Sequence, residues 1–177
     1  SSVHGLPTQG SHTLMSAPLT IRPSTPADNP RLAHIIRTVM TSYGAVGPGF
    51  SIEDVEVDHM HEAYDHARAI LYVIEDEAGT VLGCGGIAPL QDGEPDTCEL
   101  KKMYFLPEAR GHGIGRRLVT TLEADARARG FRYMYLETLH SMVEAGRLYQ
   151  KMAFDPLPGP MGNTGHSGCG LFYGKVL

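Results

Sequence analysis

Long apolar runs and basic clusters are both missing from this sequence of 177 residues. No run reaches the about 20 apolar residues that a membrane-spanning helix requires, and no segment of the signal-peptide type opens the chain. The net charge is -5, and Arg110, Arg116 and Arg117 lie close together without forming a long basic run. Nucleic-acid-binding proteins normally carry a basic patch. We therefore expect neither a membrane nor nucleic acid as a partner.

Cysteine is also scarce, because the chain has three, widely spaced and in no Cys-x-x-Cys pair. An odd number of isolated cysteines indicates reduced thiols, so we expect a cytoplasmic protein. His59, His61 and His66 lie near one another, but they do not supply the pair four residues apart that is typical of a helical zinc site. The pattern therefore predicts no metal.

Length and composition favour one folded domain. A chain of 177 residues with 42% hydrophobic residues can bury one sizeable core, and the commonest domains have about 100–150 residues. Residues 1–14 are rich in Ser, Gly, His and Thr and look like an expression leader or a disordered tail, with Met15 as the expected natural start. We therefore expect a single domain over residues 15–177.

Hydrophobic periodicity predicts a mixed α/β chain of the α+β type. Apolar residues at helical spacing mark four helices, with Asp28 as one expected N-cap and Ser51 and Asp54 as a capping box. Short runs rich in Val, Ile and Leu mark the strands. The predicted strands cover residues 19–22, 69–75, 81–89, 99–105, 133–137 and 170–176, and the predicted helices cover residues 28–43, 51–67, 113–129 and 142–152. We expect strands two to four to be antiparallel and a helix to cross between strands four and five.

A glycine-rich turn, Arg110-Gly111-His112-Gly113-Ile114-Gly115, joins a predicted strand to a predicted helix. The first N–H groups of a helix have no intrahelical partner and carry partial positive charge, so they attract phosphate oxygens. The three glycines of this turn can take positive φ angles and place no side chain in the way. The neighbouring arginines suit phosphate geometry. The turn therefore predicts a cofactor that carries phosphate.

Two common phosphate-binding motifs do not fit this turn. The dinucleotide pattern Gly-x-Gly-x-x-Gly needs a third glycine where Arg116 stands, and no acidic residue occupies a fitting strand end about 20 residues later. The nucleoside triphosphate loop needs Gly-Lys-Ser or Gly-Lys-Thr, which occurs nowhere in the chain. The pattern that fits residues 110–115 is Arg-x-x-Gly-x-Gly, an acetyl-CoA signature.

Three motifs stand in one order along the chain. Ile21-Arg22-Pro23 comes first, residues 99–115 with the Arg-x-x-Gly-x-Gly turn come second, and Leu148-Tyr149-Gln150-Lys151-Met152-Ala153-Phe154 comes last. In this order, which spans most of the chain, the sequence resembles the GCN5-related N-acetyltransferase (GNAT) family. The resemblance implies a GNAT-type acyl-CoA N-acyltransferase fold, with a mixed sheet of six to seven strands, strands four and five splayed apart, and about four helices. It also implies acetyl-CoA as cosubstrate, no metal, and a homodimer as one expectation.

The resemblance also implies where acetyl-CoA is held. The pantetheine arm is expected to pair with the backbone of Met103, Tyr104 and Phe105, in the V between strands four and five. The pyrophosphate is expected on Arg110, Gly111, His112, Gly113, Ile114, Gly115 and Arg116. Two positions depart from the family pattern, because Met142 stands where an asparagine is common and Ala153 stands where a glycine is usual.

Acetyl transfer also needs a proton acceptor and a proton donor. Glu99 lies eleven residues before Arg110, where some family members carry a glutamate that acts as general base, because an alkyl ammonium must lose a proton before it attacks. Glu137 or a water molecule is the alternative base, and Glu99 is otherwise an ordinary strand carboxylate paired with Lys101 or with a neighbouring strand. Tyr149 matches the family tyrosine that protonates the departing thiolate, and is otherwise a packed core tyrosine.

These residues together predict an acetyl-CoA-dependent N-acetyltransferase. We expect direct attack, in a ternary complex, by the primary amine of a small molecule or amino acid. The alternatives are a non-catalytic acyl-CoA-binding sensor or partner domain and a protein or peptide N-acetyltransferase. Substrate choice is expected to rest on residues 43–51 and 156–169, the second of which is equally well a solvated connector.

Overall fold

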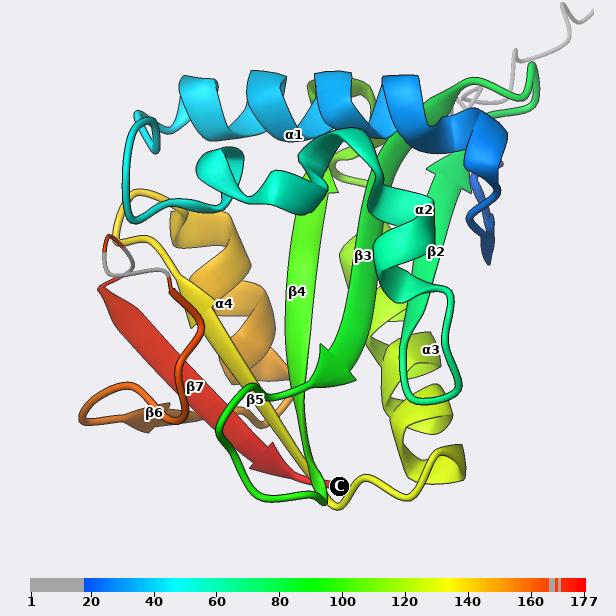
Figure 1. Ribbon diagram of the computed structural model, residues 1–177. Coiled ribbons are helices and arrows are strands. Elements are labelled where there is room, and N and C mark those ends of the chain that lie inside the picture. The colour runs from blue at the N-terminus through cyan, green and yellow to red at the C-terminus, as the bar shows by residue number, and fades with distance from the viewer. Residues whose placement is uncertain (1–17, 166–167, 169) are drawn as a thin grey trace, which may run out of the picture.

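The computed structural model describes residues 18–165, 168 and 170–177 (Figure 1). Residues 1–17, including the predicted leader, lie outside this range. The described residues form a seven-stranded sheet in the order β1-β2-β3-β4-β5-β7-β6. The strands are β1 (Thr20–Pro23), β2 (Ile70–Glu75), β3 (Val81–Pro89), β4 (Thr97–Phe105), β5 (Tyr133–Thr138), β6 (Asp155–Leu157) and β7 (Leu171–Val176). The helices are α1 (Asn29–Ser42), α2 (Met60–Tyr64), α3 (Ile114–Ala128) and α4 (Val143–Lys151), with short 3-10 turns η1 (Pro26–Asp28), η2 (Ser51–Glu53), η3 (Val55–Asp58) and η4 (Pro107–Ala109).

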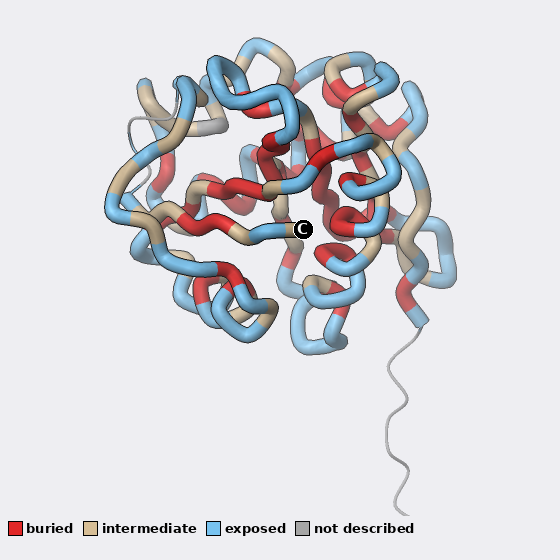
Figure 2. The backbone as a smooth tube through the Cα atoms, turned by 90° about the horizontal axis from the view of Figure 1, so that it is seen from below, coloured by how far each residue is buried: buried red, intermediate tan, exposed pale blue. Residues whose placement is uncertain are grey.

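The helices form layers on both faces of the sheet. In Figure 1, α1 and α2 lie in front of the strands, whereas α3 and α4 lie behind them. Adjacent glycines of β3 let both layers approach closely: a Cβ on Gly86 would lie 3.1 Å from Tyr64 of α2, and one on Gly85 would lie 2.7 Å from Leu118 of α3. Figure 2 shows the buried stretches of backbone gathered inside an exposed shell. The described residues contain no helix that is long and apolar enough to cross a membrane.

The predicted apolar faces of the helices are the faces that pack on the sheet. In α1, Leu32, Ile35 and Ile36 are fully buried, and in α3 the same holds for Leu118 and Leu122. Burial of a large aliphatic side chain contributes about 1.5–3 kcal/mol. Packing against the sheet, more than intrinsic helix propensity, therefore stabilises these helices.

Strands β4 and β5 run parallel but stay paired only at their beginnings. The register joins Thr97 to Tyr133 and ends where Glu99 meets Tyr135. Beyond that point β4 continues to Phe105 without its β5 partner. Figure 1 shows the two strands diverging from their common lower end. The expected splay of strands four and five is confirmed.

The predicted helix over residues 51–67 is wrong in its continuity. The segment consists of η2, η3 and the five-residue α2. Asp54 breaks the run because its backbone is extended, with φ -62° and ψ 134°, and its carboxylate binds the ammonium of Lys102 on β4. That contact replaces the helical geometry which the sequence pattern favours.

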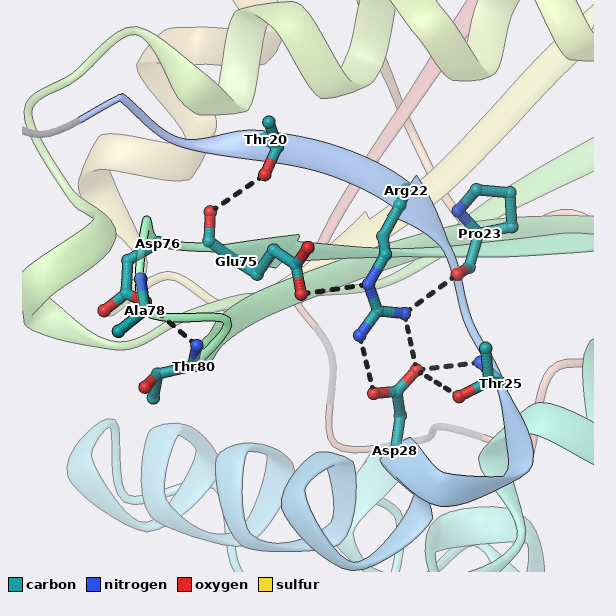
Figure 3. Close-up of polar contacts among 9 residues, drawn as sticks. All are labelled: Thr20, Arg22, Pro23, Thr25, Asp28, Glu75, Asp76, Ala78 and Thr80. Carbon is teal, nitrogen blue, oxygen red and sulfur yellow. Dashed lines mark hydrogen bonds and ion pairs between the residues drawn. The ribbon is translucent and has the colours of Figure 1, made fainter.

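The predicted N-cap at Asp28 is also only partly right. Asp28 occupies the position before α1, but its side chain does not cap that helix. Figure 3 shows the carboxylate turned toward β1, where it accepts bidentate hydrogen bonds of 2.9 Å from Arg22 and a bond of 2.8 Å from the Thr25 N–H. Arg22 also donates to Glu75 of β2 at 3.0 Å. The group therefore ties β1 and β2 to the start of α1.

The Asp28 carboxylate makes stability depend on pH. Burial raises the pKa of Asp28, but the hydrogen bonds from Arg22 and Thr25 together lower it by more than burial raises it. The pKa therefore lies below its ordinary value. The charged group therefore stabilises the fold above pH about 4, and this contribution is lost as the pH falls through the lowered pKa. We expect Asp28→Asn to cost about 2 kcal/mol at pH 7 in urea unfolding, and less at pH 3. The exposed Asp96→Asn is the control, and an equal deficit at both pH values would contradict the assignment.

Candidate active site

The glycine turn presents a row of unoccupied backbone donors. No acceptor among the described residues takes the N–H groups of residues 111–116, which lead into α3. Gly111 and Gly113 have φ angles of 80° and 68°, and a Cβ on either would meet nothing within 4 Å. The turn therefore combines unfilled donors with open space beside two of its glycines, and this arrangement fits the phosphates of an acyl-CoA, which would satisfy the donors.

Gly115 has a different role from the other two glycines of the turn. It lies inside α3 and does not take a positive φ. A Cβ there would lie 2.9 Å from Leu148 Cδ2 of α4. Gly115 therefore lets α3 and α4 pack closely.

The arginines around the turn divide into bound and unbound side chains. Arg110 donates to the Phe105 carbonyl at 3.1 and 2.8 Å and lies over the Tyr43 ring at 5.8 Å. Arg117 donates to the Leu19 carbonyl at 3.1 Å. Arg116 is exposed and hydrogen-bonds no described residue through its guanidinium. Arg116 is therefore the arginine whose side chain is most available to an anion.

A cavity lies where β4 and β5 part. It is lined by Met40, Glu99, Leu100, Lys101, Lys102, Met103, Tyr104, Glu137, Thr138, Leu139, Met142, Ala145 and Tyr149. The cavity therefore brings together both predicted base residues, the predicted acid and two of the three strand residues expected to meet the cofactor. Phe105, the third, is not part of the lining.

Glu99 is buried on β4 and lies near a cation. Its residue is 4% exposed, and its Oε1 lies 3.9 Å from Lys101 Nζ. The predicted pairing with Lys101 is thus present, but the two atoms are too far apart for a hydrogen bond. Glu99 therefore faces the cavity as a carboxylate with a nearby positive charge.

Glu137 is anchored by two hydroxyl groups. Tyr135 donates to its Oε2 at 2.7 Å, and Thr164 donates to its Oε1 at 2.5 Å. Tyr135 also accepts a bond of 3.2 Å from the Met161 N–H, and burial raises its pKa, so the phenol stays protonated. These bonds attach the loop before β7 to the end of β5.

The two loops expected to choose the substrate meet each other. The Gly168 N–H donates to the Gly49 carbonyl at 2.8 Å, which joins the segment after α1 to the loop before β7. Within the loop over residues 156–169, Thr164 contacts Glu137. Residues 166, 167 and 169 lie outside the described residues.

Tyr149 presents a neutral phenol to the cavity. It is 5% exposed, and its ring packs edge-on to Phe154 at 5.7 Å and tilted to Tyr173 at 6.2 Å. Its hydroxyl makes no hydrogen bond with any described residue. Burial raises the pKa of Tyr149 well above its ordinary value. The Tyr149 hydroxyl therefore keeps its proton and is available to donate it to a ligand in the cavity.

Comparison with known proteins decides the family. A model described as "Acetyltransferase (GNAT) family" matches residues 34–154. The chain belongs to this family. It is therefore an acetyltransferase of the acyltransferase class, and the GNAT resemblance is confirmed.

Named relatives and solved structures agree with the family. The chain is similar to the uncharacterized N-acetyltransferase YjgM of Escherichia coli K12, with 41% identity over 80% of this chain and 85% of that protein. It is also similar to an IAA acetyltransferase of Azospirillum brasilense, with 40% identity over 69% of this chain and 78% of that one. Two solved structures share the fold: a Staphylococcus aureus Mu50 GNAT acetyltransferase (TM-score 0.78, 15% identity, 90% and 99% covered) and Salmonella typhimurium yncA with its cofactor acetyl-CoA (TM-score 0.68, 22% identity, 90% and 94% covered).

Two departures from the GNAT motif are accommodated locally. Ala153, at the usual glycine position, keeps a left-handed backbone with φ 66°, which costs about 1–2 kcal/mol for a residue with a Cβ. Met142 stands at the usual asparagine position and accepts a weak bond from the Thr138 hydroxyl at 3.7 Å. Both residues therefore lie in ordered turns that flank α4.

Sequence reasoning missed a buried lysine of this acetyltransferase. Lys102 has φ 59° at a β-bulge opposite Gly85, and its side chain is 0% exposed. Its ammonium binds Asp54 and lies 3.5 Å from Glu56. A lysine inside an otherwise buried strand was the available signal, because such a charge is rarely buried without a partner.

The described cysteines are buried thiols, and the described histidines form no metal site. Cys84 and Cys98 are free and buried, and burial raises the pKa of each thiol to about 12. No group of three or more His, Cys, Asp or Glu in the described part of the chain is placed to hold a metal ion. Cys169 lies outside that part.

Proposed function

We propose that this acetyltransferase transfers the acetyl group of acetyl-CoA to a primary amine of a small molecule or amino acid, by direct attack in a ternary complex in the cytoplasm. The observation that carries the proposal is the row of unoccupied N–H groups over residues 111–116, beside the unpaired edge of β4. A β-edge suits an extended amide-containing arm, and a helix start suits a pyrophosphate. The relative named IAA acetyltransferase supports acetyl transfer, and the complex of yncA with its cofactor acetyl-CoA supports acetyl-CoA as the donor.

The residues that would hold acetyl-CoA lie along the open edge of β4 and in the glycine turn that follows it. The backbone of Met103, Tyr104 and Phe105 lies on the edge of β4 that β5 leaves open. The N–H groups of residues 111–116 and the Arg116 guanidinium would hold the phosphates. Arg110 braces the end of β4 through the Phe105 carbonyl, and in this way keeps the turn in place.

Glu99 and Tyr149 would move the two protons of the reaction. When bound, acetyl-CoA supplies an acetyl carbonyl carried on a thiol leaving group. Glu99 accepts a proton from the acceptor ammonium, directly or through water, and so frees the nitrogen lone pair for attack on that carbonyl. Tyr149 donates its phenolic proton to the sulfur as the carbon–sulfur bond breaks. Both side chains line the same cavity.

A single methyl group at Gly113 tests the phosphate site. Gly113→Ala places a Cβ in the open space that faces the turn, so we expect the KM for acetyl-CoA to rise about tenfold or more. Gly79→Ala is the matched control, because Gly79 also has a positive φ, 79°, and nothing within 4 Å of its Cβ position. Equal KM values in the two variants would argue against phosphate binding at the turn.

Replacement of Glu99 tests the base. We expect Glu99→Gln to lower kcat about 100-fold or more and to remove the acidic limb of the pH–rate profile. Glu137→Gln, measured in parallel, should keep that limb, since Glu137 is held by Tyr135 and Thr164. The opposite result would assign the base to Glu137.

Replacement of Tyr149 tests the acid. We expect Tyr149→Phe to lower kcat about 100-fold with little change in KM. Its melting temperature should stay near that of the wild type, because the hydroxyl binds no described residue. Tyr173→Phe is the control, since Tyr173 packs against Tyr149 but does not line the cavity. Full activity in Tyr149→Phe would contradict the acid role.

A further inference from the structure

Lys101 presents an ammonium group to the reaction cavity without using its hydrogen bonds. Its side chain is 22% exposed and lies on β4 two residues after Glu99. The Nζ atom is 3.9 Å from Glu99 and 4.0 Å from Glu56, and both distances exceed hydrogen-bond length. No described residue accepts a hydrogen bond from this group. Three N–H donors therefore remain for a ligand in the cavity.

The neighbouring acidic side chains are already engaged by a different lysine. Adjacent residues of a strand normally point to opposite faces, but the bulge at Lys102 brings both lysine ammonium groups to Glu56, at 4.0 and 3.5 Å. The buried Lys102 also binds Asp54. Lys102 thus provides the close counter-charge for these two carboxylates, and Lys101 stays directed toward Glu99 and the cavity.

We propose that Lys101 binds the carboxylate of the acceptor, so that the substrate is a free α-amino acid whose amine lies on Glu99. This inference rests on the proposed function and specifies its substrate class. In an α-amino acid the amine nitrogen and a carboxylate oxygen lie roughly 3 Å apart, as the N–Cα, Cα–C and C–O bond lengths require. The Glu99–Lys101 pair, 3.9 Å apart, matches that spacing with opposite charges.

The pairing also suits the reaction. The acceptor ammonium hydrogen-bonds Glu99, and its carboxylate receives charge-assisted hydrogen bonds from Lys101, which fixes the nitrogen relative to the cavity. An amine without the carboxylate keeps only the first contact. The loss of one hydrogen bond to a charged group corresponds to about tenfold or more in affinity.

The test compares acceptors that differ only at the carboxylate. The twenty standard L-amino acids, their carboxamides and their decarboxylated amines are assayed for CoA release from acetyl-CoA by the wild type, Lys101→Met, Lys101→Arg and the exposed control Lys151→Met. Binding of the best acceptor and of its carboxamide to enzyme saturated with CoA is measured by calorimetry, which does not depend on turnover.

We expect an amino acid to exceed its carboxamide at least about tenfold in kcat/KM. Lys101→Met should raise the KM and Kd of that amino acid by a similar factor and leave those of the carboxamide nearly unchanged. Lys101→Arg should restore much of the loss, and Lys151→Met should behave as the wild type.

Three outcomes would overturn the inference. Carboxamides or decarboxylated amines that match or exceed the amino acids would show that no carboxylate is recognised. An equal loss on every acceptor in Lys101→Met would show that Lys101 acts as a counter-ion of Glu99 alone. CoA release with none of these amines would overturn this inference together with the amino-acid part of the proposed function, whereas the first two outcomes leave the proposed function standing.

Discussion

The site depends on one feature of the sheet, the parting of β4 from β5 after Glu99 and Tyr135. Backbone groups inside a protein need hydrogen-bond partners, and here a strand in the middle of a sheet runs on to Phe105 without its β5 neighbour. The cavity occupies the gap. Because the strands part in the middle of the sheet, residues from β4, β5 and α4 converge on one small volume. The cavity therefore exists because the pairing of β4 with β5 ends early.

The bulge at Lys102 is the second determinant of the site. A left-handed backbone at a residue with a Cβ is strained by about 1–2 kcal/mol, and the fold holds it through the buried contacts of Lys102 with Asp54 and Glu56. Bulges near active sites commonly redirect a side chain. At this bulge, Lys102 binds Asp54 and lies near Glu56, and so joins the segment after α1 to the strand that carries Glu99.

Much of the fold follows from local pattern, and the failures have a common cause. Apolar spacing predicted α1 and α3, because their buried faces repeat at helical intervals. The same reasoning predicted one helix over residues 51–67. Asp54 breaks that helix because its carboxylate binds Lys102, 48 positions later in the chain. Asp28 was expected to cap α1, yet its carboxylate binds Arg22 on β1. Ionic contacts between separate elements produce no periodic pattern in a sequence, so hydrophobic spacing alone does not predict them.

The open N–H groups over residues 111–116 also have a practical consequence. Donors at a helix start recognise the charge and shape of an oxyanion and not the molecule that carries it. If the turn holds the coenzyme pyrophosphate, as proposed above, sulfate or inorganic phosphate in a buffer would compete for the same donors, and added salt would screen the attraction as well. The affinity for acetyl-CoA would then be weaker in phosphate buffer than in a buffer that contains neither an oxyanion nor a primary amine, and the ratio of the two affinities would report on the turn.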